Sequence, residues 1–272
     1  GASAMTFGML GCNFHCDFCQ NWFSSQVLRD PASENAWRTI EEVTPEELVL
    51  YAQRSGAKII ASSYNEPLIT SEWAIDIFQL ARKAGLYCVY VSNGFATPEI
   101  LHALQPTLQG FKVDLKCMSE QHYRALGGDL QVVLDSISLA HSLGMWVEVV
   151  TLVIPDFNDS NEELWDAAKA IANISVDIPW HVTAFYPTYK HTQAPPTSAE
   201  ILQRAADIGQ EAGLRYVYAG NLPGRVGSLE NTYCPQCHSL LVERHGYWVT
   251  KNVLAGIGLC PTCGTKIAGV WG

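Results

Sequence analysis

The chain has 272 residues, of which 48% are hydrophobic and 16% charged, so it carries enough apolar material for a packed core. This composition excludes an intrinsically disordered protein. The formal net charge of −10 argues against nucleic acid or an anionic membrane as the main partner. No apolar run approaches the ~20 residues of a membrane span and no signal peptide is visible, so we expect a cytoplasmic protein.

Seven apolar runs predict strands of a parallel sheet, because they are rich in β-branched and aromatic residues and are mostly apolar on both faces. They are residues 5–10, 58–64, 87–93, 110–116, 146–155, 179–187 and 215–221. Amphipathic segments between them predict helices, several with an N-terminal capping signal and a glycine at the end. They are residues 44–55, 71–84, 97–104, 129–143, 161–174 and 198–212.

This alternation is typical of βα units and leaves two α/β architectures, a doubly wound sheet or a full or partial barrel. We predict a partial (β/α)6-type TIM-like barrel over residues 1–227. A linker at residues 222–228 would lead into a small C-terminal four-cysteine metal-binding module, residues 228–272. In either architecture the chemistry collects at the carboxyl ends of the strands.

Nine cysteines in one cytoplasmic chain need an explanation, and seven of them form two tight clusters. A disulfide framework would spread the cysteines more evenly and belongs to an oxidising compartment. Clustered thiols therefore indicate metal ligands. Cys88 and Cys117 stand alone on apolar strands and are predicted to be packing residues.

The first cluster is Cys12, Cys16 and Cys19, spaced C-x3-C-x2-C directly after the first predicted strand. Three thiolates on one loop hold three corners of an iron–sulfur cluster and leave one iron open, as a catalytic metal requires. Phe18 would shield such a cluster. The alternatives are a packing cluster or a zinc site completed by His15 or a distant residue.

This motif, with an aromatic residue before its third cysteine, is similar to the signature of radical S-adenosylmethionine enzymes. The resemblance implies that Cys12, Cys16 and Cys19 bind a [4Fe–4S] cluster whose fourth iron is chelated by S-adenosyl-L-methionine. It also implies that one electron from the cluster cleaves the sulfonium. The resulting 5′-deoxyadenosyl radical would abstract hydrogen from a substrate.

The resemblance extends to later strands and implies further cofactor contacts. Asn65-Glu66-Pro67 resembles the family's Gly-Gly-Glu-Pro-like motif, and a carboxylate such as Glu66 suits the ligand's ammonium group. The other implied cofactor-binding residues resemble those of the pyruvate-formate-lyase-activating branch: Asn21, Ser92, Asn93, Asp114, Lys116 and His181. Lys116 would pair with the carboxylate or ribose side of the ligand. Lys116 and His181 are the predicted catalytic residues. The alternatives are a rim salt bridge for Glu66, Asp114 and Lys116, and a packed histidine for His181.

Two departures from the pattern of glycyl-radical-activating enzymes bear on the substrate. The positions of an acidic residue and an arginine in those enzymes fall on Val91 and Val150.

The chain more closely resembles the radical enzyme of the AmmeMemoRadiSam system, in segments 11–22, 179–181 and 230–235. That family usually has more residues ahead of the first strand, so we expect an N-terminally shortened piece. The implied partners are Memo-like and AMMECR-like companion proteins, an electron donor such as flavodoxin or ferredoxin, and an unidentified small-molecule or protein substrate.

The second cluster is Cys234, Cys237, Cys260 and Cys263, in two C-P-x-C turns separated by 22 residues. Two such turns close a tetrahedral metal site. Zinc is the leading prediction, with a rubredoxin-like iron and a further iron–sulfur cluster as alternatives. About 40 residues cannot bury enough core unaided, which favours a structural role.

The predicted function is therefore a radical S-adenosylmethionine enzyme of unknown substrate. Two alternatives remain open: an activase of a glycyl-radical enzyme, and a non-catalytic, metal-bound scaffold for companion proteins.

Overall fold

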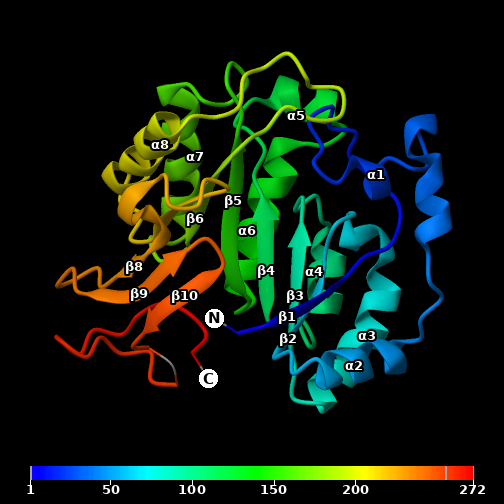
Figure 1. Ribbon diagram of the computed structural model, residues 1–272, viewed down its shortest axis with the longest axis horizontal. Helices are drawn as coiled ribbons and strands as arrows, with labels where there is room; N and C mark the ends of the chain where they lie inside the picture. The colour runs from blue at the N-terminus through cyan, green and yellow to red at the C-terminus, as the bar shows by residue number, and fades with distance from the viewer. Residues whose placement is uncertain (1, 255, 272) are drawn as a thin grey trace.

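The computed structural model describes residues 2–254 and 256–271 as a seven-stranded parallel sheet flanked by helices, with a small antiparallel sheet after it (Figure 1). The seven strands lie in chain order, each paired in parallel with the next. They are β1 (Ala4–Phe7), β2 (Ile59–Ser62), β3 (Tyr87–Ser92), β4 (Gly110–Asp114), β5 (Trp146–Val153), β6 (Trp180–Ala184) and β7 (Val217–Gly220). This order excludes a doubly wound sheet, in which the strand order reverses near the middle. β1 and β7 are the two edges of the sheet.

All six predicted helices are present within two residues of their expected ends. They are α2 (Pro45–Arg54), α3 (Ser71–Lys83), α4 (Pro98–Leu104), α6 (Leu130–Ser142), α7 (Asn161–Ile174) and α8 (Ala199–Glu211). All of them except α3 start with a side-chain cap, and on α2 Thr44 and Glu47 form a complete capping box. Left-handed glycines follow several of them, as at Gly56 and Gly144.

The pattern missed short helical segments near the strand ends. They are α1 (Trp22–Ser25), η1 (Pro31–Thr39), η2 (Pro67–Thr70) and α5 (Glu120–Leu126). Only α5 had a clear local signal, a Ser119 cap and a left-handed Gly127. With seven residues, it is too short for a helical period to stand out.

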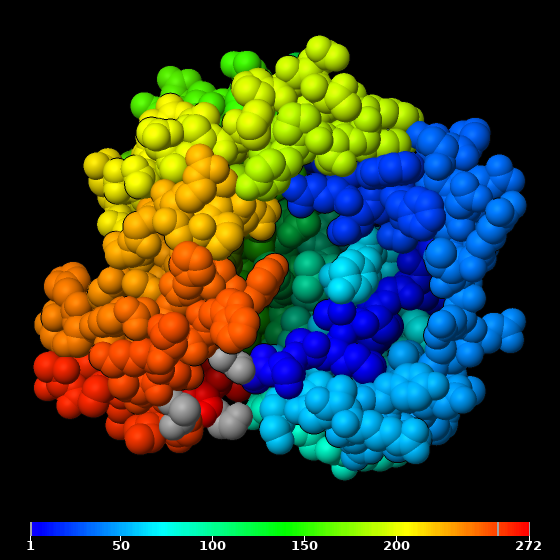
Figure 2. Space-filling model, in the orientation of Figure 1, coloured from blue at the N-terminus to red at the C-terminus, as the bar shows by residue number. Residues whose placement is uncertain are grey.

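The apolar runs predicted strands that are mostly apolar on both faces, but only one face of the sheet is apolar. Along β3, buried residues alternate with half-buried ones. The buried set packs under the helices. The other face carries charged and polar side chains, among them Lys112, Glu148 and His181. Figure 2 shows why: the molecule is hollowed at its centre, between the N-terminal strand and the C-terminal segment. The sheet therefore has a polar inner face that is accessible to small molecules.

The C-terminal segment forms its own small sheet in the order β10-β9-β8. Its elements are η3 (Gly227–Glu230), β8 (Thr232–Tyr233), β9 (Leu240–His245) and β10 (Trp248–Asn252). Its apolar core of Leu241, Leu254 and Ile267 also includes Tyr216. The segment expected as a linker is anchored, since Leu222 and Val226 are buried in the core of the large unit. The boundary at residue 227 stays a prediction. Among the described residues, no helix is long and apolar enough to cross a membrane.

Candidate functional site

The loop between β1 and α1 brings Cys12, Cys16 and Cys19 to one cavity of about 250 Å³. The loop turns at Gly11, just before the first cysteine, with a φ of +99° that a side chain would disfavour. Two main-chain hydrogen bonds hold it, Gly11 N to Ser24 O at 3.0 Å and His15 N to Leu126 O at 3.0 Å. The cavity lies beyond the carboxyl ends of the strands, where parallel α/β folds place their chemistry.

The three thiols lie in surroundings that suit a cluster. Burial raises the pKa of Cys12 to about 11 and that of Cys16 to about 12. Such thiols stay protonated at neutral pH unless a metal displaces the proton. The Sγ of Cys12 accepts a hydrogen bond from the Phe14 amide at 3.3 Å, and the Sγ of Cys19 lies 3.2 Å from Ser25 Oγ. Sulfur ligands with nearby donors are typical of iron–sulfur sites, so the donor set fits a cluster.

Phe18 and His15 have different surroundings. Phe18 is 3% exposed and lines the cavity, with its ring 5.3 Å from that of Phe157. Phe18 therefore lies beside the cysteines, and its shielding of a cluster stays a prediction. The exposed His15 ring lies against Gly127 instead, outside the residues that line the cavity. The structure therefore offers no support for a zinc site completed by His15.

Glu66 connects the motifs that follow the second and third strands. It is 2% exposed, and its Oε1 accepts hydrogen bonds from Ser92 Oγ at 2.7 Å and the Leu68 amide at 3.0 Å. Its Oε2 accepts one from the Asn93 amide at 2.7 Å. Burial raises the pKa of Glu66 to about 7, although these donors oppose the rise. The two motifs are thus one hydrogen-bonded unit, and an ammonium contact of Glu66 stays a prediction.

Asn93 continues this unit to the cysteine loop, because its Nδ2 donates to Asn13 Oδ1 at 2.7 Å. On the other side, Asn65 Oδ1 accepts a hydrogen bond from the Met9 amide at 2.9 Å. The cysteine loop is therefore joined to the ends of both β2 and β3. Sequence analysis had not identified Asn13, since an asparagine inside a cysteine motif gives no signal of its own.

Lys116 and Asp114 form an ion pair of 2.9 Å at the end of β4. Burial alone would lower the pKa of Lys116. The Asp114 carboxylate, which attracts and hydrogen-bonds the ammonium, outweighs burial, so the pKa lies above its ordinary value. Lys116 is therefore a permanent cation facing the three cysteines, suited to an anionic group of a ligand.

The cavity gathers eleven of the twelve residues predicted for the cluster and its ligand. They are Cys12, Cys16, Phe18, Cys19, Asn21, Asn65, Glu66, Ser92, Asn93, Asp114 and Lys116. His181 is placed elsewhere, with its Nε2 2.9 Å from Glu148 Oε2 and its ring stacked on Tyr218 at 5.2 Å. Sequence analysis missed Lys112 and Thr183, which also line the cavity. The period-2 alternation of a strand would have found Lys112, because it shares a face with Asp114.

The Glu148–His181 pair belongs to a polar chain that reaches the C-terminal segment. Tyr218 Oη lies 2.9 Å from Thr232 Oγ1, which also accepts a hydrogen bond from Arg244 at 2.8 Å. The Arg244 guanidinium lies 5.7 Å from the centre of the Tyr218 ring. The small sheet therefore contributes side chains to the inner face of the large one.

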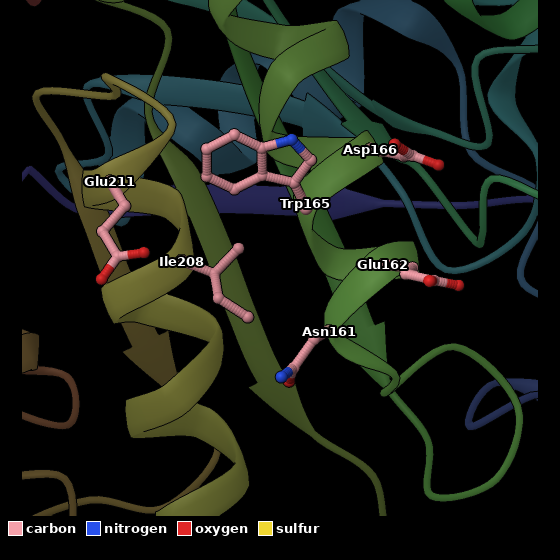
Figure 3. Close-up of a pocket in the computed structure, with 6 residues that line it drawn as sticks. All are labelled: Asn161, Glu162, Trp165, Asp166, Ile208 and Glu211. Atoms are coloured by element: carbon pink, nitrogen blue, oxygen red, sulfur yellow. The ribbon is translucent and has the colours of Figure 1, made fainter.

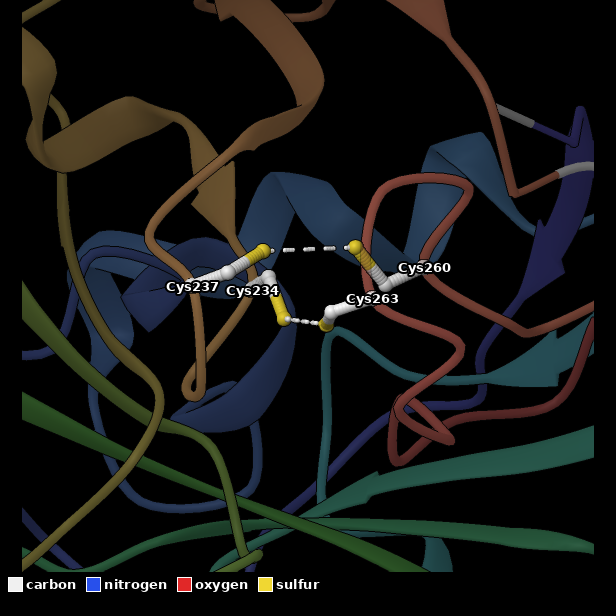
Figure 4. A group of neighbouring side chains, drawn as sticks. All are labelled: Cys234, Cys237, Cys260 and Cys263. Atoms are coloured by element: carbon white, nitrogen blue, oxygen red, sulfur yellow. Dashed lines mark hydrogen bonds between the residues drawn. The ribbon is translucent and has the colours of Figure 1, made fainter.

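The second cysteine group forms a closed site (Figure 4). The Sγ atoms of Cys234, Cys237, Cys260 and Cys263 all lie within 4.8 Å of one another. The Cys234–Cys263 and Cys237–Cys260 pairs are each 3.6 Å apart. A tetrahedron with metal–sulfur bonds of about 2.3 Å has sulfur–sulfur edges of about 3.8 Å. The four cysteines therefore fit one metal ion, and the geometry suits zinc or iron.

A wider depression of about 550 Å³ lies on the outer surface, between α7 and α8 (Figure 3). Trp165 lies at its centre, while Glu162 and Asp166 point away from Ile208 and Glu211. Its lining contains no thiol and none of the predicted site residues. We therefore place the chemistry at the cysteine cavity.

The fold and the cavity together define a parallel α/β protein with a three-cysteine cluster site at the carboxyl ends of its strands. Residues 7–171 match the Radical SAM superfamily. This match covers more than half of the chain, so the chain belongs to that superfamily. Membership implies a [4Fe–4S] cluster and S-adenosylmethionine, and the cysteine cavity has residues that fit both.

The relatives agree with this assignment. The uncharacterized protein MJ0808 of Methanocaldococcus jannaschii is 38% identical over 259 residues, covering 94% of this chain and 75% of the relative. The pyruvate formate-lyase-activating enzyme of Clostridium pasteurianum is 24% identical over 174 residues, covering 60% of this chain and 67% of that enzyme. A radical SAM methyltransferase from Sphaerobacter thermophilus, 14% identical, has a TM-score of 0.59 over 82% of this chain and 69% of its own. This last likeness shows a shared fold.

Proposed function

We propose that this chain reductively cleaves S-adenosylmethionine at a [4Fe–4S] cluster held by Cys12, Cys16 and Cys19, giving a 5′-deoxyadenosyl radical that abstracts hydrogen from a substrate. The observation that carries the proposal is the convergence of three thiols, a buried carboxylate and a permanent cation on one cavity. Superfamily membership supports the same chemistry.

The residues of the cavity have separate proposed roles. Lys116, kept charged by Asp114, would bind the ligand's carboxylate or ribose oxygens. Ser92 and Asn93, held by Glu66, would give a rigid polar wall for its amino group. Phe18 would exclude water from the cluster. Asn21 lies at the edge of the cavity and would contact the nucleoside side.

A substrate-side role suits His181 better than a cofactor contact. Its ring already bonds Glu148, and it stands two residues before Thr183 on the same strand face. It would therefore meet a molecule lying deeper on the inner face than the cofactor.

The test is anaerobic reconstitution followed by iron and sulfide analysis, electron paramagnetic resonance and chromatography of the nucleoside products. We expect about four irons at the loop and a spectrum that changes when S-adenosylmethionine is added. After chemical reduction, 5′-deoxyadenosine should accumulate. Protein that takes up no cluster at the loop would contradict the proposal.

The matched variants are Cys16→Ala and Cys88→Ala, both changing a buried thiol. Cys16→Ala should abolish the cluster and the cleavage. Cys88→Ala should keep both, because its thiol is enclosed by the helical layer and hydrogen-bonds Phe78 O.

A second candidate is activation of a glycyl-radical enzyme, favoured by similarity to the Clostridium pasteurianum activase. The apolar Val91 and Val150 line the cavity where the resemblance expected an acid and an arginine, which argues against it. A third candidate is a non-catalytic scaffold. The Cys16→Ala variant separates the two: it should abolish cleavage if the chain is an enzyme, whereas companion binding should survive if the chain is a scaffold.

For partners, we propose that the chain acts within an AmmeMemoRadiSam-type system. Memo-like and AMMECR-like proteins would be its companions, and flavodoxin or ferredoxin its electron donor. The support is the sequence resemblance in segments 11–22, 179–181 and 230–235. Co-elution of purified Memo-like protein with this chain would support the assignment, and independent elution at micromolar concentrations would oppose it.

We also propose that the four C-terminal cysteines bind a structural zinc ion. The closed tetrahedron of sulfurs supports this, because a structural site leaves no open position. Native protein analysed by mass spectrometry should contain one zinc per chain beside the loop iron. Iron alone at this site would indicate a rubredoxin-like centre instead.

A further inference from the structure

A tight turn at residues 188–191, here called the clasp turn, lies against the cysteine loop although about 170 residues separate them in the chain. Two main-chain amides of this turn, Lys190 N and His191 N, donate to Asp17 O at 3.0 and 3.1 Å. Asp17 lies between Cys16 and Cys19. The carbonyl of the cysteine loop is thus held by a segment that follows β6.

Side chains of the clasp turn add contacts on both sides of Cys19. Before it, His191 Nδ1 lies 3.1 Å from Asp17 Oδ2, and the His191 ring meets Phe18 edge-on at 6.2 Å. After it, the Tyr189 ring stacks on Trp22 at 5.3 Å with an interplanar angle of 9°. The segment that contains Cys19 is therefore held by the clasp turn on both sides of this cysteine.

A third attachment runs to Asp30. Tyr189 Oη and Lys190 Nζ both bond the Oδ2 of this carboxylate, the latter at 2.8 Å. Lys190 and Tyr189 hold the pKa of Asp30 below its ordinary range. Tyr189 has a φ of 54°, an unfavourable conformation for a side-chain-bearing residue. The contacts of the turn outweigh this strain, which favours a built attachment over an incidental surface contact.

We propose that the clasp turn positions and retains the cysteine loop, with Tyr189 as the principal positioning residue. This proposal rests on the proposed function. The loop has little regular structure of its own between Cys12 and Asn21. Without external attachments, the third thiol would not keep a fixed position relative to the other two. The turn also contacts Phe18, which lines the cysteine cavity.

The test compares Tyr189→Leu, Tyr189→Phe and Tyr186→Leu in the full chain. Tyr186 is the matched control, because it is a half-exposed tyrosine of the same segment whose hydroxyl bonds Asn221 O instead. Loss of a stacked ring and of a hydrogen bond to a carboxylate should speed air-induced cluster loss in Tyr189→Leu roughly tenfold. Tyr189→Phe keeps the stack and should lose the cluster at an intermediate rate. Tyr186→Leu should behave as wild type.

Two further measurements separate positioning from general stability. In metal-free protein, hydrogen–deuterium exchange of residues 12–30 should accelerate in Tyr189→Leu, while the strands stay protected. In loaded protein, the reduction potential of the cluster should shift, whereas the melting temperature should change little.

The outcomes distinguish the two proposals. If wild-type protein holds a cluster and Tyr189→Leu loses it at the wild-type rate, the clasp proposal is wrong and the function stands. Equal acceleration in Tyr186→Leu also overturns it, because the effect would then be general loosening. If wild-type protein binds no cluster, the proposed function fails and the clasp proposal with it, whatever the exchange data show.

Discussion

The two cysteine groups of this chain are built in opposite ways. The C-terminal group consists of two turns with the same internal hydrogen bonds: Cys234 N to Ser239 O at 3.0 Å, and Cys260 N to Thr265 O at 2.8 Å. Each turn also has a left-handed residue after its second cysteine, His238 in one and Gly264 in the other. Each turn therefore sets two thiols by itself, and bringing the turns together completes the site.

The loop of Cys12, Cys16 and Cys19 has no comparable local order. Its shape depends on Ser24, Leu126, Asn93 and the clasp turn, which come from four different parts of the chain. The thiols differ accordingly. Burial raises the pKa of Cys16 to about 12, whereas hydrogen bonds from Ser239 lower that of Cys237 to about 6. The comparison indicates that the C-terminal cysteine group is encoded by local turns, while the cysteine loop is assembled by the fold.

The largest expected effect is the loss of the locally encoded site. Cys260→Ala removes one of the four cysteines proposed to bind zinc, and a structural zinc ion contributes on the order of 10 kcal/mol to folding in small modules. We expect residues 230–271 to lose protection in hydrogen–deuterium exchange while β1–β7 stay protected. Cys117→Ala is the control, since its thiol bonds only Ser119 O. Collapse of the whole chain would show that the two regions are one cooperative unit.

The next effect concerns the assembled site and its dependence on pH. Burial raises the pKa of Glu66 from 4.5 to about 7, so the folded state binds the proton more tightly than the unfolded state. The free energy of unfolding should therefore fall as pH rises from about 4.5 to 7, by about 3 kcal/mol at most. Glu66→Gln should remove this slope. Urea unfolding at several pH values measures this dependence, with the exposed Glu211→Gln as the control. Equal slopes of unfolding free energy against pH in wild type and Glu66→Gln would contradict the prediction.

A smaller effect would sharpen the difference between the thiols. In metal-free protein, the Cys237 thiol should be half ionised near pH 6, because Ser239 stabilises its thiolate. Ser239→Ala should raise this midpoint by roughly one pH unit. Alkylation rates followed by peptide mass spectrometry measure it, with Ser142→Ala as the control. An unchanged midpoint would mean that the turn backbone, rather than the hydroxyl, lowers the pKa.

The smallest effect tests the contact between the two regions. Arg244 donates to Thr232 and lies over the Tyr218 ring, so Arg244→Met should destabilise the protein by about 1–2 kcal/mol. Lys251→Met, on the exposed neighbouring strand, should change stability by less than about 0.5 kcal/mol. If both variants change stability equally, the small sheet packs on the large one without a specific polar contact.

Much of the cavity was predictable because its residues follow strands. Glu66, Asn93, Asp114 and Lys116 lie at the carboxyl ends of predicted strands or just beyond them, and parallel strands bring their carboxyl ends together. His181 shows the limit of this reasoning. It stands near the start of β6 rather than beyond its end, so the fold directs it to Glu148. Short segments such as α5 escaped because seven residues give no reliable period.

The amino-acid sequence by itself determined which motifs follow which strand, the six longer helices and both cysteine groups, since these depend on spacing, periodicity and local capping. Only the tertiary structure decided that Glu66 bonds the end of β3 and that the clasp turn holds the cysteine loop. The physical reason is the separation of the interacting residues along the chain. Local hydrogen bonds and side-chain periodicity involve residues a few positions apart, whereas contacts between residues 27 to 174 positions apart exist only after the sheet has formed.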